Sequence, residues 1–151
     1  MTSLALALLL LCAPALAGLP PDPDLSADAP QGWRQSIEGP FTLFLPPKLH
    51  RVGPKLFDSI AGKFAGTGLS VEYDYGYYVP DCVDGDQAVI GGRRVEIVRT
   101  AGANGGLRVT ACFAAPKRGA KRLTIRAAAN DEASAEDALT AFQTIRFSKR
   151  P

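Results

Sequence analysis

Apolar and polar residues alternate without a break along residues 69–79, the stretch LSVEYDYGYYV. One face of this stretch carries Leu69, Val71, Tyr73, Tyr75, Tyr77 and Val79, and the other carries Ser70, Glu72, Asp74, Gly76 and Tyr78. Successive side chains of a strand point to opposite faces, so the pattern predicts a half-buried antiparallel strand. The crowding of the tyrosines then follows from β-propensity. Tyr78, which points away from the apolar face beside Asp74, is left as a candidate binding residue.

Shorter patterns predict further strands. Residues 41–45 (FTLFL) lie between Gly39-Pro40 and Pro46-Pro47, and these breakers limit a strand to that length. Residues 48–67 hold too many glycines for a helix, so an extended, hairpin-forming segment is expected there. Other strands are expected at residues 88–90, 94–100, 107–114 and 122–128, with a hairpin turn at Asn104-Gly105.

The C-terminal part of the chain has the pattern of an amphipathic helix. Ala135, Ala138, Leu139, Phe142 and Ile145 recur at helical spacing. Ser134 and Asp137 have the spacing of a capping box at the start of this helix, and residues 145–147 are expected to add a short final strand. The chain is therefore predicted to be α+β, with a single antiparallel sheet of about six strands and a C-terminal helix packed on it.

The N-terminus predicts export. Residues 1–17 resemble a cleavable signal peptide, with a leucine-rich run followed by Ala-x-Ala and cleavage between Ala17 and Gly18. The run is too short to cross a bilayer, so no transmembrane segment is predicted. Lipidation of Cys12 is disfavoured because bulky leucines precede it. Residues 18–32, rich in Pro and Asp, are expected to form a flexible arm before a single α+β domain at residues 33–151, with Trp33 as its anchor.

Two cysteines remain after removal of the signal peptide, Cys82 and Cys112. An even pair in an exported chain predicts a disulfide. Strand alternation places Cys112 on the face opposite Val109 and Ala111, where it can meet Cys82 from a loop.

Several motifs together resemble a known fold. PFTLFLPP, the long strands that follow it, and an alanine-rich helix ending in TIRF resemble the PsbP-like α/β/α sandwich superfamily over residues 38–148. FDSIAGKF followed by EYDYGYY is similar to a DS…G…DYG pattern of small uncharacterised bacterial exported proteins. The resemblance implies an antiparallel sheet carrying helices and a non-catalytic assembly or binding role, and it implies no catalytic residues.

Basic residues are concentrated in one region. Residues 88–126 carry nine Lys or Arg and one Asp or Glu, whereas residues 18–87 carry five and ten. Alternation within the strands is expected to place several of them on one solvent-exposed basic face, represented by Arg94, Arg99, Arg108 and Arg122. An exported protein rarely meets nucleic acid, so the expected partner is an unknown envelope protein or an acidic surface.

Catalytic residue sets are scarce in this chain. His50 is the only histidine, and a hydrolase would need it, or an acid such as Asp74, to act with Asp58 and Ser59. Ser59 does not stand in a G-x-S-x-G motif. Glu72 and Asp74 lie two residues apart on one strand face, and no other sugar-site signature accompanies them.

No metal or cofactor site is predicted. Histidine and cysteine are too few for a transition-metal site, and the glycine-rich segments lack the context of nucleotide-binding loops. Asp81, Asp84 and Asp86 do not have the spacing of an EF-hand, and Asp-Gly is expected in a turn.

The sequence therefore predicts an exported, non-catalytic binding or assembly module. Asp58, Ser59, Asp74 and Tyr78 are the candidate binding residues. One alternative is a small hydrolase that uses Asp58 and Ser59 with Asp74. The other is a scaffold that contacts acidic envelope components through its basic strand face.

Overall fold

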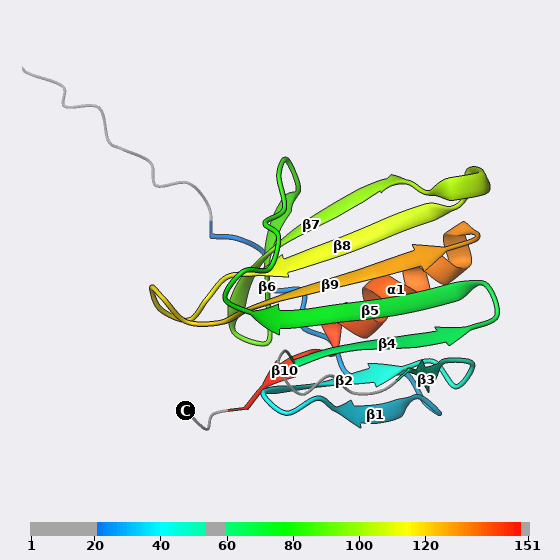
Figure 1. The fold of residues 1–151 in the computed structure, drawn as a ribbon, viewed down its shortest axis with the longest axis horizontal. Helices are drawn as coiled ribbons and strands as arrows, with labels where there is room; N and C mark the ends of the chain where they lie inside the picture. Colours follow the sequence, from blue (N-terminus) through cyan, green and yellow to red (C-terminus); the bar gives the residue numbers. More distant parts are fainter. Residues whose placement is uncertain (1–20, 54–59, 149–151) are drawn as a thin grey trace, which may run out of the picture.

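A computed structural model of the chain describes residues 21–53 and 60–148 (Figure 1). The predicted signal peptide with its cleavage site, together with Cys12, Asp58 and Ser59, lies outside these residues. The described strands are β1 (Arg34–Ile37), β2 (Phe41–Leu45), β3 (His50–Val52), β4 (Ile60–Gly66), β5 (Leu69–Gly76), β6 (Asp86–Ile90), β7 (Arg93–Ala101), β8 (Leu107–Phe113), β9 (Arg122–Ala129) and β10 (Arg146–Phe147). A helix, α1 (Glu132–Gln143), precedes β10, and a short 3-10 turn, η1 (Ala103–Gly105), joins β7 to β8.

The strands form two sheets. The larger has seven strands in the order β3-β4-β5-β9-β8-β7-β6, and the smaller has three in the order β1-β2-β10. The α+β class and the antiparallel pairing are confirmed, but the prediction of a single six-stranded sheet is wrong. Prolines on both sides of β2 stop it from extending, and it pairs with β1 and with β10 instead of joining the larger sheet.

The tyrosine strand is confirmed over residues 69–76 but ends earlier than predicted. Leu69, Val71 and Tyr73 are buried, whereas Tyr77 is 58% exposed. On the β9 side, the pairing of β5 ends at Gly76. Tyr77 lies beyond this last pair and is exposed, whereas Val79 of the following loop is buried again at 4% exposed.

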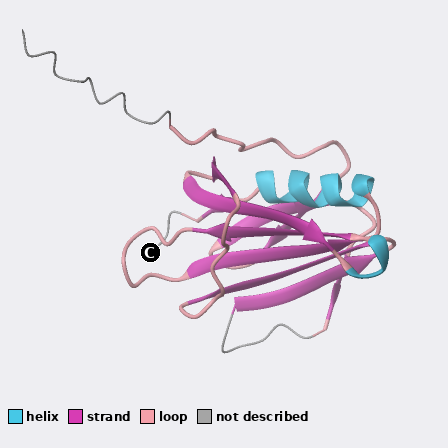
Figure 2. Ribbon diagram, turned by 90° about the horizontal axis from the view of Figure 1, so that it is seen from above, coloured by secondary structure: helices cyan, strands magenta, loops and turns pink. Residues whose placement is uncertain are grey.

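Helix α1 lies across one face of the larger sheet (Figure 2). Its cap is Asp131, whose carboxylate accepts a hydrogen bond of 2.7 Å from the Ser134 N–H. The helix therefore begins earlier than the predicted box at Ser134 and Asp137. The predicted apolar stripe is confirmed, since Ala135, Ala138 and Phe142 are fully or almost fully buried.

The hydrophobic core lies where α1, the larger sheet and β2 meet. Phe41 of β2 is fully buried, and its ring packs edge-on against Tyr73 of β5 at 5.2 Å between centroids. The backbone N–H of Phe44 donates a 2.8 Å hydrogen bond to Thr144 Oγ1 at the end of the helix. These contacts fasten the smaller sheet beside the helix.

The described part of the N-terminal arm lies against the domain. Val89 of the edge strand β6 donates a backbone hydrogen bond to Pro23 and accepts one from Leu25, both at 2.8 Å. Ala27 then donates to the carbonyl of Gln143 at 3.0 Å. Backbone hydrogen bonds thus hold this arm on the domain, although its sequence has no periodic apolar pattern. At the end of the arm, Trp33 is partly buried against the core.

A buried carboxylate joins the two sheets. Glu38, in the turn between β1 and β2, is 0% exposed. It accepts hydrogen bonds from Ser36 Oγ at 2.5 Å, from Arg51 of β3 and from the Tyr73 hydroxyl of β5. Burial by itself raises the pKa of Glu38, but these hydrogen bonds outweigh burial and hold it below its usual value. Burial, and then the Glu38 carboxylate, raise the pKa of Tyr73 to about 12.

Removal of this carboxylate is expected to destabilise the fold strongly. Glu38→Ala leaves the buried Tyr73 hydroxyl and the Arg51 guanidinium without their acceptor, which should lower the free energy of unfolding by about 3 kcal/mol. Glu136→Ala removes a carboxylate from an exposed ion pair with Arg99 and should cost less than about 1 kcal/mol. Urea denaturation measures both, and equal losses for the two variants would contradict a special role for Glu38.

Tyr73 should also make the fold sensitive to alkali. Its pKa is raised in the folded state from 10.0 to about 12, so its stabilising contribution is complete below pH 10 and is lost as the pH rises toward 12. Urea denaturation at several pH values should therefore show a steeper fall between pH 10 and 12 in the wild type than in Tyr73→Phe. Parallel curves would show that Tyr73 does not carry this dependence.

Candidate functional site

The face of the larger sheet that points away from α1, called the open face below, is covered at one end by the loop of residues 77–85. The loop is fixed by the disulfide between Cys82 and Cys112, whose Cα atoms lie 5.7 Å apart. This confirms the predicted pairing. Next to the disulfide, Thr124 Oγ1 donates a 3.0 Å hydrogen bond to the carbonyl of Pro80. The loop therefore buries Thr124 although this residue faces away from the helix.

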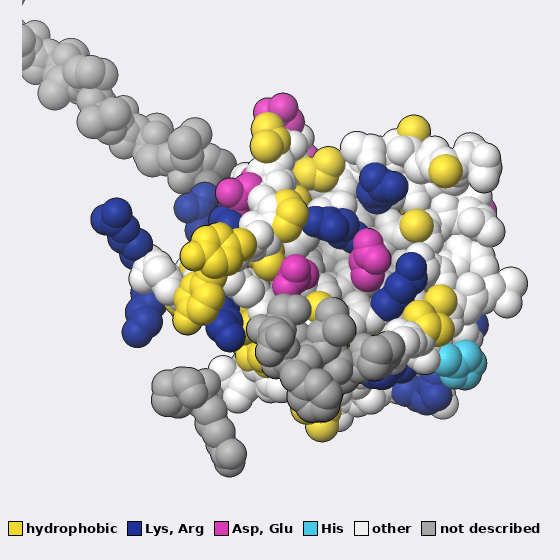
Figure 3. All heavy atoms as spheres, viewed as in Figure 1, with side chains coloured by type: hydrophobic (Ala, Val, Ile, Leu, Met, Phe, Trp, Pro, Cys, Tyr) yellow, Lys and Arg dark blue, Asp and Glu magenta, His cyan; other side chains and the backbone are white. Residues whose placement is uncertain are grey.

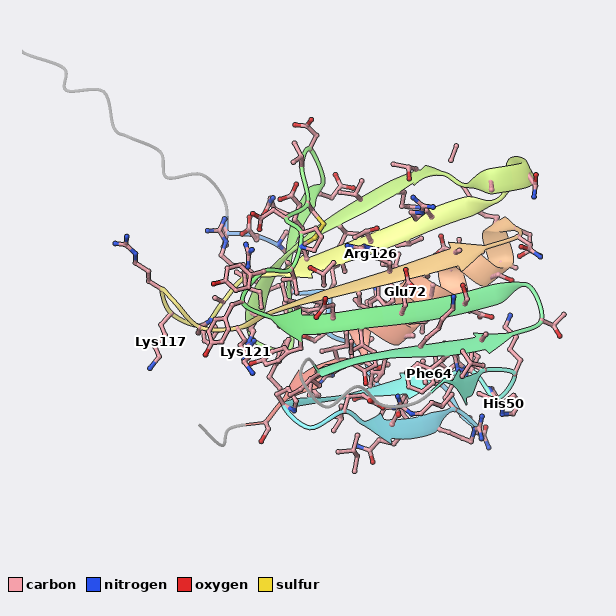
Figure 4. All side chains as sticks on the ribbon, in the orientation of Figure 1. His50, Phe64, Glu72, Lys117, Lys121 and Arg126 are labelled. Atoms are coloured by element: carbon pink, nitrogen blue, oxygen red, sulfur yellow. A yellow bond between two sulfur atoms is a disulfide. The ribbon has the colours of Figure 1, made fainter. Side chains whose placement is uncertain are left out.

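Charged side chains occupy the middle of the open face. The register pairs Lys63 of β4 with Glu72 of β5, Glu72 with Arg126 of β9, and Arg126 with Thr110 of β8. These four residues form one row across four neighbouring strands, in which side chains of adjacent strands are about 5 Å apart. Figure 4 shows Glu72 and Arg126 next to each other, and Figure 3 shows basic and acidic side chains close together on this face.

The charged residues of this region have no partners among the described residues. Within residues 21–53 and 60–148, no ion pair or hydrogen bond of the side chain is found for Lys63, Glu72, Asp74, Arg108 or Arg126. Other arginines of the same sheet differ in this respect. Arg94 pairs with Asp22 at 3.1 Å, and Arg122 pairs with Asp81. No described residue uses the hydrogen-bonding capacity of these five side chains, which favours their binding a ligand.

Two adjoining hollows open over this row. One, of about 420 Å³, extends toward β4 and is lined by Val52, Ala61, Gly62, Lys63, Glu72, Tyr73, Asp74, Thr124 and Arg126. The other, of about 490 Å³, extends toward β8 and is lined by Lys63, Ser70, Glu72, Arg108, Thr110, Arg126, Ala127 and Ala128. Lys63, Glu72 and Arg126 line both, so the hollows form one groove across the sheet, called the charged groove below.

The structure changes the predicted basic face. Arg94, Arg108 and Arg122 do lie on the open face, but Arg99 lies on the opposite face, where its guanidinium donates to Glu132 at 2.5 Å and to Glu136 at 2.9 Å. The placement of Arg99 was wrong because its register partner is the buried Val109. Arg99 therefore fastens β7 to α1.

Asp74 and Tyr78 both line a hollow at the end of β5, but only Asp74 also lines the charged groove. Asp74 is half-buried and lines the charged groove. Tyr78 is 99% exposed in the loop beyond the end of β5 and does not line it. Sequence reasoning missed Lys63 and included Arg126 only as one of the nine basic residues of 88–126, because only the register of β4, β5 and β9 brings these two residues to either side of Glu72.

His50 and a possible metal site add nothing to the charged groove. His50 is exposed on β3, and its Nδ1 lies 3.4 Å from an Arg34 guanidinium nitrogen. In the part of the chain that the structure describes, no three His, Cys, Asp or Glu side chains are grouped so as to hold a metal ion. No helix in the same part is long and apolar enough to cross a membrane.

Comparison with known proteins adds no further candidate. A scan against models of protein families gives no match, and a search of curated proteins finds no similar sequence. The candidate site therefore stands on its geometry.

The disulfide should contribute measurably to stability. Cys82 and Cys112 are 30 residues apart, and loop-closure entropy for such a separation amounts to about 3–4 kcal/mol. The double variant Cys82→Ser/Cys112→Ser should therefore unfold at a clearly lower urea concentration than the oxidised protein. Wild type reduced with a thiol should behave like the double variant. An unchanged midpoint in both would mean that the other loop contacts suffice.

Proposed function

We propose that this protein is an exported, non-catalytic binding module, and that its charged groove binds a polar ligand bearing a carboxylate or phosphate group. The single observation that carries the proposal is the contrast among the cations of one sheet face. Arg108, Arg126 and Lys63 line a concave surface without an acidic partner among the described residues, while Arg94 and Arg122 are paired. A guanidinium left open in a hollow suits bidentate binding of a carboxylate or phosphate.

The two ends of the groove favour different chemical groups on the ligand. Glu72 and Asp74 lie on its β5 side, and the hydroxyls of Ser70 and Thr110 lie near the arginines. Acidic oxygens accept hydrogen bonds from hydroxyl or ammonium groups. The ligand we propose therefore carries an anionic group at the Arg108–Arg126 end and a hydroxyl or ammonium group at the Glu72–Asp74 end.

Export is supported by two features. The first 17 residues have the pattern of a signal peptide, and the Cys82–Cys112 disulfide is of a kind that persists in oxidising compartments. A periplasmic or secreted location fits both. The hydrolase alternative depends on Asp58 and Ser59, outside the described residues, so nothing in the groove favours it over binding.

The test is an NMR titration of the oxidised protein with inorganic phosphate and with citrate as probes. We expect the backbone amide signals of residues around Arg108 and Arg126 to shift. Arg126→Gln removes a charged donor and should weaken binding about tenfold or more.

The matched control is Arg118→Gln, since Arg118 is exposed and lies outside the groove. This variant loses the same charge and should bind the probes like the wild type. Equal weakening in the two variants would indicate diffuse attraction to a basic protein and would contradict a site in the groove.

A further inference from the structure

A second surface lies at one end of the larger sheet, where it adjoins the charged groove at Asp74. It consists of Tyr77 and Tyr78 from the loop after β5 and of Lys117, Arg118 and Lys121 from the connection between β8 and β9, and it is called the tyrosine–lysine tip below. Tyr77, Tyr78 and Lys121 line one hollow together with the half-buried Asp74, and the Lys121 ammonium lies 5.4 Å from the centre of the Tyr77 ring. Figure 4 shows Lys117 and Lys121 at this end, and in Figure 3 apolar and basic side chains gather there.

The aromatic rings of the tip are held outward by a fixed loop. Tyr78 is 99% exposed, yet the next residue, Val79, is only 4% exposed. The carbonyl of Val79 accepts a 2.9 Å hydrogen bond from Arg122, and the disulfide at Cys82 fastens the loop to β8. An exposed aromatic pair on a loop fastened at several points is a pre-arranged contact surface, because little conformational entropy remains to be lost on binding.

The cations of the tip are available for an external partner. Lys117 and Arg118 are exposed and have no ion pair or hydrogen bond of the side chain within residues 21–53 and 60–148. The nearest acidic groups reduce this charge only in part, since Asp81 is paired with Arg122 and Asp74 is half-buried. Asp84 and Asp86 follow the disulfide cysteine Cys82 in the chain, and Asp86 is the first residue of β6.

We propose that the tyrosine–lysine tip docks the protein on an anionic lipid surface. Tyrosine is enriched at membrane interfaces because its ring is apolar and its hydroxyl remains hydrated, and lysine and arginine are attracted to anionic headgroups. A specific protein partner is less well matched, because such interfaces take about 20–30 residues on each side, whereas the tip offers five. The docked protein would keep its charged groove accessible, since that groove lies on the face of the sheet rather than at its end.

The test is co-sedimentation of the oxidised protein with vesicles of phosphatidylcholine alone or mixed with phosphatidylglycerol. We expect binding to the mixed vesicles only, with a decrease as salt rises. Each removed cation should weaken binding about fivefold, so Lys117→Gln/Arg118→Gln/Lys121→Gln should abolish sedimentation. Tyr78→Ser should weaken it with the charge unchanged. Because Tyr78, Lys117 and Arg118 are exposed and Lys121 is only half-buried, thermal unfolding should match the wild type closely.

The matched control is Arg108→Gln/Arg126→Gln, which removes two cations from the charged groove and should sediment like the wild type. Loss of sedimentation in this control as well would overturn the assignment to the tip. Equal binding to pure phosphatidylcholine, or no binding to either vesicle, would overturn the lipid proposal. Retention on immobilised polyglutamate without vesicle binding would also overturn the lipid proposal, and it would indicate that the tip binds an acidic protein partner. Phosphate or citrate binding by the groove is measured separately, so either proposal can fail without the other.

Discussion

The buried carboxylate of Glu38 is the contact on which the arrangement of the two sheets depends. It lies in the turn of the smaller sheet and binds Arg51 of β3 and Tyr73 of β5, so one ionised group connects three segments of the chain. A glycine on β4 completes this site, because a Cβ at Gly62 would approach the Tyr73 hydroxyl to 2.6 Å. The buried charge is tolerated since its oxygens accept three hydrogen bonds, one of them from a cation.

This network also positions the candidate binding surface. Gly62 faces the carboxylate cluster, so its neighbour Lys63 points to the open face, where it stands opposite Glu72. Tyr73 faces the core between Glu72 and Asp74, which both line the charged groove. Side chains on one face of β4 and β5 therefore form the junction between the sheets, and side chains on the other face line the groove.

The disulfide loop borders both proposed surfaces, which meet at Asp74. Where it covers the open face it buries Thr124 and closes the end of the sheet beside the groove. Beyond the last residue of β5 the same loop presents Tyr77 and Tyr78 to solvent. A groove on the face and a tip at the end allow one module to hold a ligand while it contacts a surface.

Much of the fold was predictable because local pattern and final environment agree. Alternation identified β5 up to Gly76, helical spacing identified the buried stripe of α1, and the pair of cysteines outside the predicted signal peptide identified the disulfide. The prediction failed for Tyr77, where alternation continues but the pairing with β9 has ended. It also failed for Arg99, where a charged residue takes a position facing the helix because two glutamates of α1 neutralise it.

The sequence by itself determined most of the strands, the helix, and which two cysteines pair, because these properties depend on residues close together in the chain or on simple counting, although it did not predict β1. Only the tertiary structure decided that β2 leaves the main sheet, that Glu38 is the buried junction, and that Lys63, Glu72 and Arg126 share a row. The physical reason is register. Residues 63, 72 and 126 become neighbours through backbone pairing between distant strands, and no local periodicity encodes which strands will pair or at which residue.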